Sequence, residues 1–222
     1  MRAVLLDALG GPESLRIGEA DVPEPGPGEL RIRVKAASLN PADYMILSRG
    51  MPSWTFPVVA GLDGAGVVDA VGPDVPAWRV GDRAMVHGSF AGLGAYAEYL
   101  VHPAHAAAPV PAGVSFADAV GIMCAGITAL QAIDRRMRLV AGESLLVQAG
   151  AGGVGGFAIQ IAKLRGLAVY TTCSAANADW CRRLGADATI DYRGEDVGAR
   201  VAELTGGRGV DASFLAAPSP PP

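Results

Sequence analysis

The pattern of apolar and polar residues changes character once along this chain. Up to about residue 125, apolar segments are short and are separated by turns rich in Pro and Gly. The segments are Arg2–Leu6, Glu29–Ala37, Val58–Ala60, Gly66–Ala70, Arg83–His87 and Ala95–Val101. Many short strands with turns of this kind predict a small, partly closed β-barrel.

After about residue 140, apolar runs alternate with helical patterns. Four runs have the length of buried strands: Ser144–Ala149, Leu167–Cys173, Ala188–Tyr192 and Val210–Leu215. The residues between them predict a helix directly after the first run, a second over about 176–184 and a third over Val197–Leu204. Strands and helices alternating at this spacing predict a parallel, doubly wound α/β sheet.

A helix is predicted between the two halves. Ser115 and Asp118 have the spacing of a capping box, and the small residues of 119–133 permit close packing. We therefore expect the domain boundary between about 110 and 130, with domains over 1–122 and 123–222.

A glycine-rich turn follows the first strand of the second half, reading Gly150-Ala151-Gly152-Gly153-Val154-Gly155. In a dinucleotide-binding unit the first glycine allows a tight turn, the second lets backbone approach a pyrophosphate, and the last lets helix pack closely on strand. Free N–H groups at the helix start then bind the diphosphate. The alternative is a plain strand–turn–helix element, because a chain with 30 glycines contains such spacings by chance. The strands and helices downstream favour dinucleotide binding.

Composition excludes several other functions. Half of the 222 residues are apolar, the net charge is −4 and the pI is near 5.3, so nothing indicates a nucleic-acid partner. No uninterrupted apolar run approaches the roughly 20 residues of a membrane span, and the N-terminus has no signal-peptide layout. The three cysteines are widely spaced and form no disulfide framework. We expect a cytoplasmic protein with no membrane partner.

In their order along the chain, a set of segments resembles the zinc-independent medium-chain dehydrogenases/reductases of the quinone oxidoreductase-like branch. They are Asp21–Leu30, Ala37–Gly50, Pro57–Val75, Trp78–Arg83, Gly94–Val101, Pro111–Ala129, the glycine turn and Leu184–Tyr192. The resemblance implies a GroES-like catalytic domain followed by a Rossmann domain, with the active site in the cleft between them.

The resemblance also predicts that no metal is bound. The zinc-dependent branch has a Cys near the position of Asn40 and Gly-His-Glu where this chain has Gly61-Leu62-Asp63, and residues 1–120 contain no cysteine. His102 and His105 have a ligand-like spacing but no third partner in sequence, and a catalytic zinc needs three. Without a Lewis acid, hydride transfer to a quinone or an α,β-unsaturated carbonyl is favoured over alcohol oxidation.

Three residues match active-site positions of the family. Asn40 would donate to a substrate oxygen or fix the nicotinamide carboxamide, although an Asx turn before Pro41 is the alternative. Tyr44 would donate a proton or line the pocket, and packing is the alternative. Thr128 would lie near the nicotinamide, unless it is a helical Thr bonded to its own backbone. We expect Asp43 to be structural and leave Cys124 out of the catalytic set, because no basic neighbour adjoins it in sequence.

The cofactor is predicted to be NADPH rather than NADH. NAD-selective folds place an acid about 20 residues past the glycine turn, but residues 170–174 have no carboxylate and Asp179 is the first one after them. Ser174, Asn177 and Tyr192 match family positions that bind the 2′-phosphate, and Arg193 is adjacent.

Family members continue considerably further than this chain, so we expect the Rossmann domain to be truncated after its fourth strand. Two functions follow: an NADPH-dependent reductase of quinones or enones, or a non-catalytic nucleotide-binding remnant that needs a partner chain or the missing part. The physiological substrate and the oligomeric state, including a homo-oligomer, stay open.

Overall fold

The computed structural model describes residues 1–90, 92 and 94–216. The chain forms two compact units, the first ending at Cys124 and the second beginning at Ala125. The proline-rich tail over 218–222 lies outside the described residues.

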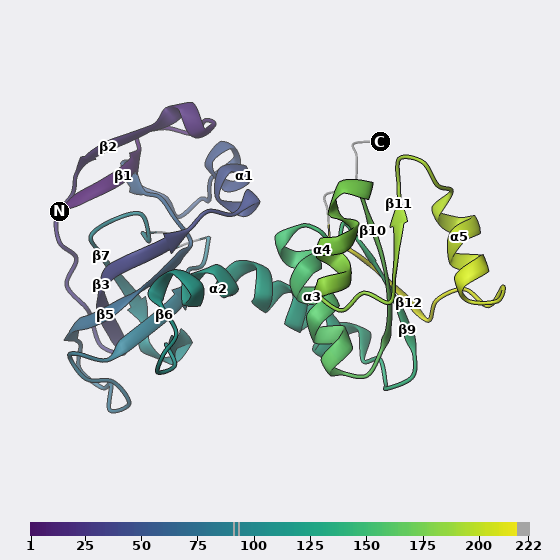
Figure 1. The fold of residues 1–222 in the computed structure, drawn as a ribbon. Coiled ribbons are helices and arrows are strands. Elements are labelled where there is room, and N and C mark those ends of the chain that lie inside the picture. Colours follow the sequence, from purple (N-terminus) through teal and green to yellow (C-terminus); the bar gives the residue numbers. More distant parts are fainter. Residues whose placement is uncertain (91, 93, 217–222) are drawn as a thin grey trace. The chain divides into compact units, whose positions relative to one another are not determined.

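The first unit consists mainly of two antiparallel sheets. One has the strand order β2-β1-β4 and the other β7-β3-β5-β6-β8. The strands are β1 (Arg2–Leu6), β2 (Leu15–Glu19), β3 (Glu29–Ser38), β4 (Val58–Val59), β5 (Asp63–Val71), β6 (Arg83–His87), β7 (Tyr99–Pro103) and β8 (Ala107–Pro109). Figure 1 shows β3, β5 and β6 side by side.

The larger sheet curls where β3 pairs with β5. The pairing register shifts between Arg31 and Ile32 and again between Val34 and Ala36, and such irregularities bend a strand and increase its twist. One core cluster of this unit consists of Leu30, Ile32, Val68, Ala84, Val86, Ala95 and Leu100, and a smaller one of Leu6, Leu47 and Ala60. The partly closed barrel predicted from the sequence is confirmed.

The sequence pattern missed several short elements of the first unit. These are the strands β2 and β8, the helix α1 (Pro41–Arg49), and the 3-10 turns η1 (Pro12–Ser14) and η2 (Ala104–Ala106). Asn40 is the N-cap of helix α1, and its backbone N–H donates to Asp43 Oδ2 over 2.7 Å. Since α1 buries only Asp43 and Leu47, it has almost no apolar periodicity to detect.

The second unit is the predicted parallel sheet with helices on both faces. Its strand order is β11-β10-β9-β12, formed by β9 (Ser144–Gln148), β10 (Ala168–Cys173), β11 (Ala188–Asp191) and β12 (Ala212–Leu215). The helices are α3 (Gly153–Leu164), η4 (Ala175–Asn177), α4 (Ala178–Arg183) and α5 (Val197–Leu204). This is the order 3-2-1-4 of a dinucleotide-binding half.

Neighbouring residues of β9 face opposite layers of this sheet. Leu145 and Val147 pack in the core that contains α3 and α4, whereas Leu146 packs with Val201 of α5. Figure 1 shows α3 and α4 on one side of the sheet and α5 on the other. The doubly wound architecture is therefore confirmed.

Helix α2 (Phe116–Leu130) contains the division between the units and continues as a π-helical segment, Gln131–Met137. Its predicted cap forms, since the backbone N–H of Asp118 donates to Ser115 Oγ over 3.0 Å.

By length and composition, Phe116–Met137 qualifies as a membrane span, with 22 residues and a mean hydropathy of 1.6. The sequence has no uninterrupted apolar run of that length. The helix is this long because its hydrogen bonding continues through the charged residue Asp134. A core helix passes the same test, and Ala119, Val120, Met123 and Ala129 of this helix are buried. The helix therefore gives little support to membrane insertion.

Candidate active site

The glycine turn lies between β9 and α3, at the carboxyl end of the parallel strands. A Cβ on Gly155 would overlap the carbonyl of Ala149 and the Cα of Gly150, and a Cβ on Gly150 would overlap the Thr171 side chain. These two glycines are required by the fold itself. The assigned roles of tight turn and close helix–strand packing are consistent with this geometry.

Gly152 is different, because the protein does not need it for packing. It caps α3 with a φ of −78°, and an added Cβ would meet only the Ala149 carbonyl, at 3.4 Å. The first-turn N–H groups of α3, including Gly153 and Val154, have no intrahelical acceptor. Exposed backbone at a helix N-terminus, with no side chain above it, fits a dinucleotide diphosphate.

The turn also contains a conformation that the sequence does not reveal. Ala149 has a φ of +60°, a left-handed backbone that is uncommon for residues other than Gly, Asn and Asp. Its N–H donates to Thr172 Oγ1 over 3.0 Å, and the N–H of Gly150 donates to the Thr172 carbonyl over 3.0 Å. These bonds fix the turn to β10.

The residues predicted to bind a 2′-phosphate lie at one edge of the parallel sheet. Ser174 follows β10 and Tyr192 follows β11, and their preceding residues Cys173 and Asp191 are register partners. Asn177 is the N-cap of α4. The Arg193 guanidinium stacks over the Tyr192 ring at 5.6 Å.

In the structure, carboxylate side chains that are distant in sequence from Ser174 lie beside it at this edge. A cavity of about 350 Å³ is lined by Ser174 together with Asp179, Asp191, Glu195 and Arg182. Arg182 is paired with Asp179 over 2.8 Å. Arg193 does not line this cavity, and among the described residues it has no carboxylate partner for its guanidinium.

The buried carboxylate of Asp63 is the centre of the polar site in the first unit. Its side chain is fully buried, and its Oδ2 accepts from Ser38 Oγ (2.6 Å), Asn40 Nδ2 (2.8 Å) and the backbone N–H of Cys124 (3.1 Å). His87 Nδ1 lies 2.6 Å from Oδ1. Burial acts to raise the pKa of Asp63, but the hydrogen bonds from His87, Ser38 and Asn40 outweigh it and hold this pKa below its ordinary value.

Asn40 has both amide hydrogens engaged within the protein. Nδ2 donates to Asp63 Oδ2 and to Ser38 Oγ, the latter over 3.1 Å. Since an amide nitrogen has two hydrogens, the remaining polar atom of the side chain is the carbonyl Oδ1, which can only accept. Of the two predicted roles, fixing the nicotinamide carboxamide agrees with this arrangement better than donating to a substrate oxygen.

The other predicted residues take separate positions. Asp43 is buried, and its Oδ1 accepts from the backbone N–H of Leu62 over 3.1 Å, which is the structural role expected of it. Tyr44 is half exposed and lines a cavity of about 360 Å³ with Asn40. Thr128 is exposed on α2 in the second unit.

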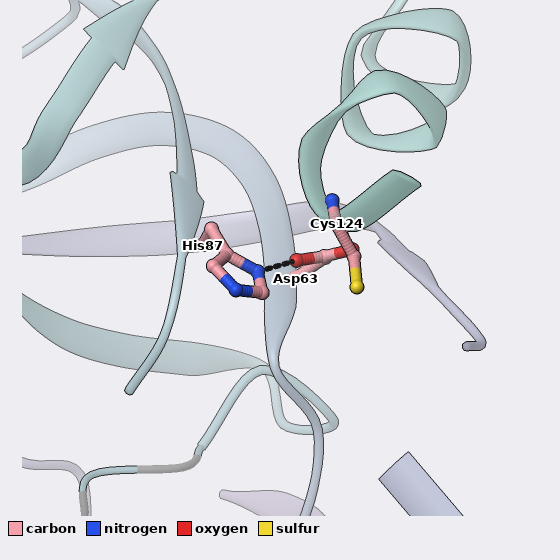
Figure 2. A group of neighbouring side chains, drawn as sticks. All are labelled: Asp63, His87 and Cys124. Atoms are coloured by element: carbon pink, nitrogen blue, oxygen red, sulfur yellow. Dashed lines mark hydrogen bonds and ion pairs between the residues drawn. The ribbon is translucent and has the colours of Figure 1, made fainter. Parts of the chain in front are cut away.

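Three potential metal ligands meet that sequence reasoning did not group. The ligand atoms of Asp63, His87 and Cys124 lie within 4.8 Å of one another, although 24 and 37 positions separate them in sequence. Figure 2 shows the Asp63 carboxylate between the imidazole of His87 and the Cys124 side chain. No sequence spacing could have identified this cluster, because it forms from β5, β6 and α2.

Asp63 Oδ1 and His87 Nδ1 lie too close together to be two ligands of one tetrahedral zinc ion. Two ligands of a tetrahedral zinc, each at about 2.0 Å from it, are about 3.3 Å apart, whereas Asp63 Oδ1 and His87 Nδ1 are at hydrogen-bond distance, 2.6 Å. Burial, together with the negative Asp63 and Asp43, raises the pKa of the Cys124 thiol to about 11. His102 is no substitute ligand, because its ring nitrogens face the carbonyls of Pro103 and His87 at 3.0 and 3.2 Å.

Known families match both units. Residues 26–112 match the family described as alcohol dehydrogenase GroES-like domain. Residues 153–221 match the family described as zinc-binding dehydrogenase.

Relatives agree with these matches. A quinone oxidoreductase of Pseudomonas aeruginosa is 40% identical over 90% of this chain and 62% of its own length. The trans-enoyl reductase tazE of Aspergillus terreus is 34% identical over 94% of this chain and 74% of its own length. A mycobacterial protein solved as a complex with NADPH is 38% identical, with a TM-score of 0.86 over 96% of this chain and 66% of that one. The chain thus spans less than two thirds of the first of these relatives.

Proposed function

The chain belongs to the medium-chain dehydrogenases/reductases of the quinone oxidoreductase type, and on this premise we propose that it is an NADPH-dependent oxidoreductase. Its substrate is a small electrophile, either a quinone or an α,β-unsaturated carbonyl. The observation that carries the proposal is the Gly152 turn, where backbone is left open at the start of α3 although packing does not require a glycine there.

The dinucleotide, when bound, supplies the hydride. The residues of this chain bind the dinucleotide and the substrate and orient them. The first turn of α3, from Gly153, binds the diphosphate. Tyr192 and Arg193, with Ser174 and Asn177, bind the 2′-phosphate and thereby favour NADPH. The mycobacterial relative solved with NADPH supports this choice.

In the first unit, Asn40 orients the nicotinamide carboxamide through Oδ1, and Tyr44 lines the cavity that Asn40 also borders. Thr128 contacts the nicotinamide from α2. Since Asp63 is saturated by four hydrogen-bond donors and lies too close to His87 for a shared metal, the reaction proceeds without zinc. A quinone or enone is electrophilic enough for direct hydride transfer. We also place the protein in the cytoplasm, which agrees with its free cysteines.

The test is a titration of the purified chain with NADPH and NADH, followed by nicotinamide fluorescence, with 1,4-benzoquinone and an enone then added. Tighter NADPH binding and acceptor-dependent oxidation are expected. Binding without oxidation would instead support the nucleotide-binding remnant. A folded sample that binds neither dinucleotide would contradict both functions.

A further inference from the structure

His87 has one ring nitrogen bound and the other available. It ends β6, with Nδ1 2.6 Å from Asp63 Oδ1, and about a third of its side chain is exposed. In the part of the chain that the structure describes, no residue is hydrogen-bonded to Nε2. Figure 2 shows the imidazole turned toward Asp63 through one edge only.

The partners of Asp63 decide which nitrogen of His87 carries the fixed proton. Ser38, Asn40 and the Cys124 N–H already donate to this carboxylate, so it is ionised and can only accept. Nδ1 must therefore donate to Oδ1 in either protonation state of the ring. Proton exchange with a ligand is then confined to Nε2.

The charged and titratable groups around His87 favour its protonated form. Asp63 on β5 and, at longer range, Asp43 on α1 are negative and raise the pKa of His87 above its ordinary value, although burial acts in the opposite direction. Cys124 on α2 stays a neutral thiol. His102 on β7 faces the His87 carbonyl, and burial lowers the pKa of its ring. Glu29 of β3 is a further carboxyl group that lines the adjoining cavity.

The cavity beside His87 has the size of a substrate site. Its volume is about 790 Å³, within the usual range for small-molecule pockets. Phe90 and Val101 supply apolar wall, and Ser89 and His102 supply polar groups. His87 also lines this cavity, so a quinone ring that lies against such a wall shares the cavity with a histidine.

Other groups near Asp63 are poor proton donors at neutral pH. The Tyr96 hydroxyl donates to the Ser38 carbonyl over 2.9 Å, and burial beside Asp43 raises the pKa of Tyr96 far above its ordinary value. The Cys124 pKa is also raised, and the Asn40 amide hydrogens are engaged. His87 is the group of this cluster that can release a proton near pH 7.

We propose that His87 is the proton donor of the reaction, with Asp63 fixing its orientation. This inference rests on the proposed function. The hydride from the reduced dinucleotide adds two electrons to the quinone and yields a hydroquinone monoanion. His87 Nε2–H transfers its proton to the phenolate oxygen, and the neutral imidazole, still donating through Nδ1 to Asp63, is reprotonated by water.

The test compares His87→Gln with His105→Gln, a change at an exposed histidine that does not line the cavity. Glutamine at 87 retains a donor for Asp63 but has no transferable proton. In benzoquinone reduction at pH 6, H87Q is expected to lower kcat about 100-fold, as for loss of a general acid. It should also abolish the solvent deuterium isotope effect and the fall in kcat with rising pH, while H105Q behaves as wild type. An unchanged pH profile in H87Q would overturn the proposal.

Two further arms keep the outcomes separate. Tyr44→Phe is expected to keep the solvent isotope effect, and its loss there but not in H87Q would assign the proton to Tyr44 instead. If the wild-type chain reduces no acceptor, the proposed function fails, and a titration with hydroquinone, followed by the ¹⁵N resonances of the histidines, decides the site. A shift of His87 Nε2 without one at His105 supports the inference, and no shift contradicts it.

Discussion

The side-chain amide of Asn40 donates to the buried carboxylate of Asp63 over 2.8 Å. The sequence indicates a functional role for Asn40. Asp63 is notable there only as the residue that stands where the zinc-dependent branch has Glu. The same carboxylate also accepts from His87 of β6 and from the backbone N–H of Cys124 in α2, so one side chain of β5 is bonded to three other segments of the first unit.

Replacing Asp63 with Asn should destabilise the first unit. The amide cannot accept from four donors, so at least one buried donor loses its partner and the charge that pairs with His87 disappears. We expect a loss of about 3 kcal/mol, or a Tm lower by about 6–12 °C. Differential scanning calorimetry measures it.

Asp7→Asn is the matched control for that change. Asp7 pairs with Arg16 at the surface, where both side chains are about half exposed. Exposed pairs contribute at most about 1 kcal/mol, so this variant should unfold almost as the wild type does. Equal effects of the two substitutions would show that Asp63 is not the centre of the network.

The His87–Asp63 pair should make stability depend on pH in both directions. The raised pKa of His87 gives stability that is complete below its unfolded value, about 6.5, and is lost as pH rises through the folded pKa. The lowered pKa of Asp63 gives stability present above about 3.9 and lost as pH falls through its folded pKa.

Thermal unfolding between pH 4 and pH 9 checks this dependence. The advantage of wild type over His87→Gln should be greatest near pH 5 to 6 and should shrink on the alkaline side. A constant difference across the range would contradict a charged pair.

Two glycines of the turn should respond differently to alanine. Gly155→Ala forces a Cβ into the Ala149 carbonyl and should destabilise the second unit by about 1–3 kcal/mol. Gly152→Ala meets only ordinary contact, so the protein should fold normally but bind NADPH at least about tenfold more weakly, a loss of about 1.4 kcal/mol. Calorimetry and fluorescence titration separate the two effects, and unimpaired NADPH binding by G152A would place the diphosphate elsewhere.

Arg193→Gln should reduce cofactor discrimination. A charge-assisted hydrogen bond contributes about 1.5–3 kcal/mol, so the Kd for NADPH should rise about tenfold or more while the Kd for NADH stays unchanged. Arg183→Gln is the matched control, because Arg183 stacks over Trp180 at 5.5 Å much as Arg193 stacks over Tyr192. If NADPH and NADH bind R193Q with the wild-type ratio, the acids lining the neighbouring cavity, and not Arg193, set the preference.

The sequence alone determined the strands and helices in which buried apolar residues recur with a clear period. The strands Arg2–Leu6 and Arg83–His87 and the helix Val197–Leu204 have the bounds that the sequence predicted, and the glycine turn lies between a strand and a helix as expected. Burial of alternate or helically spaced apolar residues is a local signal, so it can be found without knowing which segments meet. Helix α1 has no such signal, because it buries one carboxylate and one leucine.

Only the tertiary structure decided which polar groups meet. In the sequence, Asp63 is notable only because the zinc-dependent branch has Glu at this position, and His87 only because it ends a predicted strand. Neither observation indicates that the two side chains meet. Their contact depends on the pairing of β5 with β6, where Asp63 and His87 are register partners, and Cys124 arrives from a helix 61 residues away from Asp63. Hydrogen bonds require atoms within about 3 Å. Sequence periodicity does not show which side chains come within that distance of each other. The register of two paired strands does.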